Sequence, residues 1–196
     1  MSPLPTRRAE AQTPPTEDLD WRGLITAIEE EFPRFRIVAK RGNTLSHAID
    51  RALRLLTFGG QQRYISHYHT VLGYTLYVPD SWEDTEAVDR AILLCHERVH
   101  LRQRRRLGFL SMAFLYLIPL FPLGLAYGRA RLEWEAYAET LAATARYRGI
   151  AAARSPQLRD QIVRRFTGPD YAWMWPFPNQ VNSWYDEVLI GLDESS

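Results

Sequence analysis

The residues best suited to chemistry are two histidines and a glutamate in the run 96–100, which reads His-Glu-Arg-Val-His. This H-E-x-x-H pattern lies inside a helical pattern predicted over 85–106. His96 and His100 are therefore one turn apart on one face, where they can share a metal ion. Glu97 can reach a metal-bound water instead of the metal itself. The run predicts a hydrolytic zinc site with two histidine ligands and Glu97 as the catalytic base.

A catalytic zinc ion takes three protein ligands and keeps one open position, so a third ligand must come from elsewhere in the chain. A second helical pattern, over 130–148, offers Glu133 and Glu135. These two side chains point about 200° apart on a helix, so both cannot face the metal. Small and apolar residues share the face of Glu133, and a carboxylate on a buried face needs a cation. Periodicity therefore favours Glu133 as the third ligand, with Glu135 as the alternative.

The elements that position these residues follow from apolar spacing and from glycine and proline. The sequence predicts helices over 18–32, 44–56, 85–106, 130–148 and 155–166, and strands over 35–39, 63–72 and 74–78. No element is assigned to the stretch 168–184, which is rich in aromatic residues and proline. These elements predict an α+β fold that is mainly helical with a small sheet of about three strands. We expect one domain over 18–196 after a disordered tail over 1–17.

Composition limits the class of protein further. The chain has 196 residues, a net charge of +1 and one cysteine. A balanced charge gives no general attraction to nucleic acid, so no nucleic-acid partner is predicted. One cysteine excludes a disulfide framework, and the basic residues of the N-terminus are followed by no apolar run. We therefore expect a cytoplasmic protein, either free or peripheral to a membrane.

An uncharged segment of 22 residues, 107–128, connects the two predicted metal-binding helices. It is long enough to cross a bilayer, but Pro119 and Pro122 lie in its second half, and the ligands on either side of it must meet at one metal. We expect a hydrophobic hairpin that returns to the same side. The hairpin either packs on the protein core, which we favour, or dips into a membrane surface. Residues 98–132 contain seven arginines and no acidic residue, a pattern that suits anionic lipid headgroups.

Taken together, these residues resemble a known group of enzymes. The chain is similar to the small gluzincin-type zinc metallopeptidase domains, which include uncharacterised bacterial and phage proteins. It is more distantly similar to the membrane-embedded CAAX-processing and heat-shock peptidases. The likeness covers about 75–145 and is carried by His96-Glu97-x-x-His100, Gln103, Gly108 and Glu133-x-Glu135-Ala136.

The resemblance implies a zincin-like fold, a Zn²⁺ ion on His96, His100 and Glu133, and Glu97 as the base. Tyr137 stands where the membrane peptidases carry an aspartate. The implied function is a zinc-dependent metallopeptidase that hydrolyses peptide bonds in a peptide or protein substrate through a zinc-bound water.

Two parts of that implied site remain open in the sequence. An edge strand is expected to pair with the substrate, and the run 74–78 is the natural candidate. The donor for the developing oxyanion could be any one of several side chains. These candidates are Tyr116, Tyr127, Tyr137, His67 and His69. The alternative function is a non-catalytic metal-binding interaction protein that docks to a membrane or a partner through the 107–128 hairpin.

Overall fold

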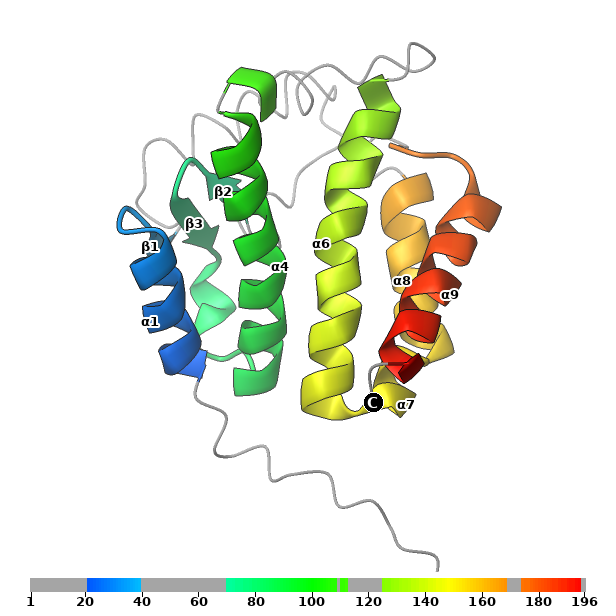
Figure 1. Ribbon diagram of the computed structural model, residues 1–196. Coiled ribbons are helices and arrows are strands. Elements are labelled where there is room, and N and C mark those ends of the chain that lie inside the picture. Colours follow the sequence, from blue (N-terminus) through cyan, green and yellow to red (C-terminus); the bar gives the residue numbers. More distant parts are fainter. Residues whose placement is uncertain (1–20, 40–69, 109, 113–124, 169–173, 195–196) are drawn as a thin grey trace, which may run out of the picture.

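Two long helices stand side by side at the centre of the molecule. They are α4 (Ala87–Leu107) and α6 (Leu125–Arg148). In Figure 1, α1 and the sheet lie on one side of this pair, and α8 and α9 lie on the other. The computed structural model describes residues 21–39, 70–108, 110–112, 125–168 and 174–194. The fold is mainly helical with a small sheet, as predicted.

The sheet has three strands, β1 (Arg36–Ala39), β2 (Thr70–Leu72) and β3 (Thr75–Val78), in the order β1-β3-β2. β1 runs parallel to β3, and β2 runs antiparallel to it. Gly73 makes the tight turn between β2 and β3 with a φ of 70°, a conformation that favours glycine. The number of strands agrees with the prediction. The expectation that the run 74–78 forms an edge strand is wrong, because β3 pairs with a neighbour along both of its sides.

The sheet side of the molecule has its own hydrophobic cluster. Helix α1 (Trp21–Glu31) ends just before Pro33, and a short 3-10 helix, η2 (Asp80–Trp82), leads from β3 towards α4. Burial of apolar side chains from these elements supplies most of the free energy that holds them together. We call this set the sheet-side cluster; it consists of Ile28, Phe32, Phe35, Leu76, Val78, Trp82, Leu94 and Leu101.

A charged contact also ties α1 to α4. The carboxylate of Glu31 accepts hydrogen bonds from Arg98 at 2.7 Å, Arg102 at 2.9 Å and Arg105 at 3.2 Å. The hydrogen bond from Arg102 is the main cause that lowers the pKa of Glu31 to about 2. Three of the seven arginines in the stretch 98–132 therefore share one carboxylate that lies 67 or more residues earlier in the chain.

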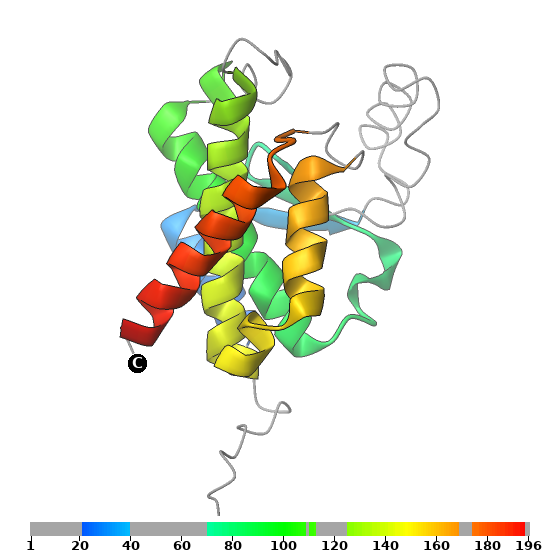
Figure 2. The same ribbon diagram turned by 90° about the vertical axis from the view of Figure 1, so that its right-hand side faces the viewer.

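The helices on the other side of α6 are α7 (Ile150–Ala153), α8 (Pro156–Thr167) and α9 (Pro178–Glu194). Ser155 caps α8, because its hydroxyl oxygen accepts a hydrogen bond from the backbone N–H of Leu158 at 3.3 Å. Figure 2 shows α8 and α9 lying against α6. Their buried residues form a second set, the helix-side cluster, made of Ala130, Trp134, Leu141, Ala153, Ile162, Phe166, Met174, Val181, Trp184, Tyr185 and Leu189.

The predicted helices agree with the structure to different degrees. The predictions over 85–106 and 155–166 match α4 and α8 closely, whereas α6 begins five residues before the predicted start at residue 130. Helix α9 was not predicted. The predicted helix over 44–56, the strand residues 63–69 and the middle of the 107–128 hairpin lie outside the described residues. Among the helices that the structure describes, none is long and apolar enough to span a membrane.

Candidate metal centre

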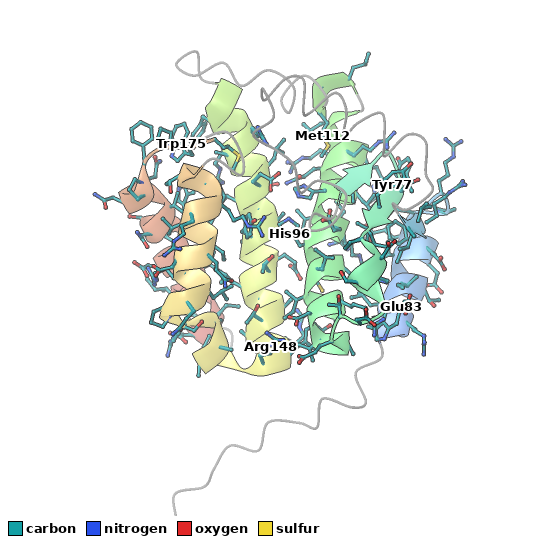
Figure 3. All side chains as sticks on the ribbon, turned by 180° about the vertical axis from the view of Figure 1, so that it is seen from behind. Tyr77, Glu83, His96, Met112, Arg148 and Trp175 are labelled. Carbon is teal, nitrogen blue, oxygen red and sulfur yellow. The ribbon has the colours of Figure 1, made fainter. Side chains whose placement is uncertain are left out.

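The three predicted ligands lie together between the two central helices. His96 and His100 come from α4 and Glu133 comes from α6, and one potential ligand atom from each lies within 4.8 Å of the others. The two imidazole Nε2 atoms are 3.2 Å apart, and Glu133 Oε2 is 3.8 Å from His100 Nε2. Figure 3 shows His96 in the middle of the molecule, between α4 and α6. His100 and Glu133 are buried, and His96 is half-buried.

Glu135, the alternative ligand, points elsewhere. Its Oε2 atom accepts hydrogen bonds from Gln103 Nε2 at 2.9 Å and from Arg106 at 3.4 Å. Its side chain is 37% exposed, whereas the side chain of Glu133 is 4% exposed. In the structure, as in the helical periodicity, Glu133 lies on the face of α6 that meets the histidines and Glu135 does not.

A hydrogen-bond chain fixes which nitrogen of His100 carries the proton. Gln103 donates its amide N–H groups to the backbone carbonyl of Leu132 at 2.8 Å and to Glu135. Both of these partners only accept hydrogen bonds, so the Oε1 atom of Gln103 is the one that faces His100. That oxygen lies 2.9 Å from His100 Nδ1 and must accept a proton from it. Nδ1 of His100 is therefore a hydrogen-bond donor, and in the neutral form of the ring Nε2 carries the lone pair and faces Glu133 and His96.

The same argument applies to His96. Its Nδ1 atom is 2.9 Å from the hydroxyl oxygen of Thr140, and that hydroxyl donates its own proton to the carbonyl of Ala136 at 3.2 Å. The Thr140 oxygen therefore accepts from Nδ1, which leaves Nε2 of His96 unprotonated. Burial, and next the neighbouring His100, hold the pKa of His96 well below its usual value, so the ring is neutral.

The two Nε2 atoms therefore face each other across 3.2 Å, with a carboxylate oxygen of Glu133 close by. With both rings in the neutral form, three electron-pair donors share one small space, and a cation bound between the side chains would be stabilised by all of them. Two imidazole nitrogens and one carboxylate oxygen form a donor set that suits Zn²⁺, and three protein ligands leave one position for a reactant. The residues present therefore fit a metal ion such as zinc.

Glu97, the predicted base, is buried beside the three ligands. Burial raises the pKa of its carboxyl to about 7; the positive charge of a protonated His100 would oppose this shift, and the carboxylate of Glu133 adds to it. A carboxyl group with a pKa near neutrality can both accept and return a proton. The structure thus places a second buried carboxyl group next to the candidate ligands without including it among them.

Of the candidates for an oxyanion donor, Tyr137 is the one that the structure places at the site. It lies one turn after Glu133 on α6, and its ring meets His96 edge-on with a centroid distance of 4.9 Å. Tyr127 packs on Trp175 instead, at 5.2 Å. The remaining candidates, Tyr116, His67 and His69, lie outside the described residues.

The sequence alone assigns no role to the two side chains that hydrogen-bond to the histidines, although Gln103 is among the residues that carry the resemblance. Gln103 and Thr140 fix the proton position on each ring, and such supporting residues are a regular feature of metal sites. A signal for Gln103 was present in the sequence, because it lies three residues after His100 and shares its helix face. The signal for Thr140 was weaker, since its partner is 44 residues away in the chain.

Comparison of the chain with family models, with curated proteins and with solved structures gives no match. The functional argument therefore rests on the geometry and chemistry of the site.

Proposed function

We propose that this protein is a zinc-dependent metallopeptidase of the gluzincin type, built on a zincin-like active-site helix. His96, His100 and Glu133 would hold the zinc ion, and Glu97 would act as the general base. The observation that carries this proposal is the convergence of two imidazole Nε2 atoms and a buried carboxylate, with a second buried carboxyl group beside them. A purely structural pair of histidines has no need of Glu97 in that position.

Each residue of the site has a defined task in amide hydrolysis. When bound, the zinc ion supplies a Lewis acid that polarises a carbonyl group and makes water more acidic. Glu97 accepts the proton of the attacking water and returns it to the leaving amine. Gln103 and Thr140 keep the imidazole rings in the orientation and tautomer that bind metal. Tyr137 contacts His96 from α6 and would be the candidate donor to the developing oxyanion.

Metal analysis of the purified full chain tests the ligand set. We expect one zinc ion per chain in the wild type and in Glu139→Gln, a control on the same helix as Glu133. Glu133→Gln should lower zinc affinity by at least tenfold. Glu135→Gln should have a smaller effect, because Glu135 acts only through Gln103. Absence of zinc from the wild type, or an equal loss in Glu133→Gln and Glu139→Gln, would contradict the proposal.

Hydrolysis of a fluorescence-quenched casein and of a mixed peptide library tests the reaction. Glu97→Gln should retain zinc while its rate falls by about 10²–10⁴, the usual contribution of a general base. A zinc-loaded wild type that cleaves none of these substrates would overturn the peptidase assignment. That result would favour the alternative, a non-catalytic metal-binding interaction protein.

A further inference from the structure

Four helix ends meet at one end of the molecule, which we call the arginine end. Here α4 finishes, α6 begins, α8 finishes and α9 begins (Figures 1 and 2). Gln103 of α4 donates a hydrogen bond to the carbonyl of Leu132 in α6, and the N–H of Trp175 donates to the carbonyl of Phe166 in α8 at 2.9 Å. Figure 3 shows Met112 and Trp175 at this end, and Glu83 and Arg148 at the opposite end.

Apolar side chains are exposed at the arginine end. Four large hydrophobic side chains are exposed among the described residues, and three of them lie here: Leu110 at 81%, Tyr127 at 43% and Phe177 at 44%. Trp175 lies between the two aromatic ones, with ring centroids 5.2 Å from Tyr127 and 5.0 Å from Phe177. Tyrosine and tryptophan side chains combine an apolar ring with a polar O–H or N–H group, and they are enriched at membrane–water interfaces for this reason.

The charged side chains at this end are mainly arginines. The described stretches 102–108, 110–112, 125–132 and 161–168 contain no acidic residue, and neither does 174–185. Together they carry the arginines Arg102, Arg104, Arg105, Arg106, Arg129, Arg131, Arg164 and Arg165. Of the acidic side chains that approach this end, Glu31 binds Arg102 and Arg105, and Glu135 binds Arg106. The end therefore keeps a clear positive excess, whereas the stretch 80–89 near the opposite end carries five acidic residues and no basic one.

We propose that the arginine end docks on the surface of an anionic lipid membrane. Arginines attract anionic headgroups, and the exposed aromatic and aliphatic side chains enter the boundary between headgroups and acyl chains. Exposed apolar side chains such as Leu110 and Phe177 have no complement on a nucleic acid, which favours lipid as the partner. The arginine end and the metal site consist of different residues. A failure of membrane docking would therefore leave the proposed zinc site intact, and the reverse also holds.

Co-sedimentation of the full chain with lipid vesicles tests the apolar contribution. The vesicles are phosphatidylcholine alone or phosphatidylcholine mixed with phosphatidylglycerol. We expect binding to the mixed vesicles that weakens with salt, and little binding to phosphatidylcholine alone. Leu110→Ser combined with Phe177→Ser should lower the partition coefficient about tenfold. The matched control is Ile190→Ser, an exposed residue further along α9, which should change nothing.

The charge contribution is tested by a second pair of variants. Arg105→Gln with Arg164→Gln should lower binding to the mixed vesicles about fivefold for each arginine removed. Arg148→Gln with Arg154→Gln removes the same charge from the opposite end and should leave binding unchanged. No binding to the mixed vesicles, or an equal loss in both pairs, would overturn the proposal. Tight binding of an oligonucleotide without vesicle binding would assign the arginine end to nucleic acid and would also overturn it.

Discussion

Gln103 offers the sharpest test of how this site is built, because it joins both central helices to one histidine. Its side chain is 2% exposed and hydrogen-bonds to His100, Leu132 and Glu135 at 2.8–2.9 Å. The change Gln103→Met keeps a side chain of similar length and volume but removes all three hydrogen bonds. We expect the variant to fold, with a less stable domain and a weaker metal site.

The magnitude follows from the groups that lose a partner. The buried Nδ1–H of His100 loses its acceptor, which costs about 1–3 kcal/mol, and the other two lost hydrogen bonds add about 1 kcal/mol. The free energy of unfolding should therefore fall by about 2–4 kcal/mol. Without its acceptor, the ring can also rotate or change tautomer, and such a loss usually lowers metal affinity by about 10–100-fold.

Two measurements separate these effects. Urea unfolding of the metal-free chain gives the stability change, and competition with a chelating dye gives the zinc affinity. Leu101→Met is the matched control. Leu101 lies two residues before Gln103 on α4, is fully buried, and packs in the apolar sheet-side cluster. It should cost less than about 1.5 kcal/mol and leave zinc affinity unchanged. If Gln103→Met binds zinc as tightly as the wild type, the proton assignment on His100 is wrong.

Three further predictions concern stability. Glu31→Gln should lower the free energy of unfolding by about 1–2 kcal/mol after solvent screening at neutral pH. Because folding lowers the pKa of Glu31 from 4.5 to about 2, its contribution is present above about pH 4.5 and is lost as the pH falls towards 2. Urea titrations of both proteins should therefore converge in acid, and a constant difference would contradict the ion-pair account. Gly73→Ala should cost about 1–2 kcal/mol by thermal unfolding, because φ is 70° and a Cβ would lie 2.8 Å from Arg104 Nη1; an unchanged melting temperature would refute this. Tyr185→Phe removes a buried hydrogen bond of 2.6 Å to the carbonyl of Ala153 and should cost about 1 kcal/mol in the same assay, whereas a neutral result would mean that the bond adds nothing.

The parts of the site that could be predicted are those that depend on one helix at a time. His96 and His100 share a face of α4 through their spacing alone, and the apolar neighbours of Glu133 on α6 separate it from Glu135. The central place of β3 could not be predicted in this way. It depends on pairing with β1, whose register joins Arg36 to Thr75 across a long stretch of chain. Such pairing is set by tertiary packing and leaves no local pattern.

Helix α9 was not predicted from the sequence for a different reason. Its first residue is Pro178, which lies in the stretch 168–184 to which no element is assigned from the sequence, although proline is common at the first position of a helix. Its buried residues Val181, Tyr185 and Leu189 are spaced four apart, so the helical period was present. The period was hidden because aromatic residues and prolines before the helix dominate the composition of 168–184.

The candidate metal centre lies on the boundary between the two hydrophobic clusters. α4 gives Leu94 and Leu101 to the sheet-side cluster, while α6 gives Trp134 and Leu141 to the helix-side cluster. A metal ion held from both helices would add a further link between two cores that meet through the packing and polar contacts of α4 and α6. Its binding free energy would then add to the cooperativity of folding, so that the two halves unfold together when it is bound. Removing it would let one half open before the other, and hydrogen exchange would report this as two separate opening energies within one chain.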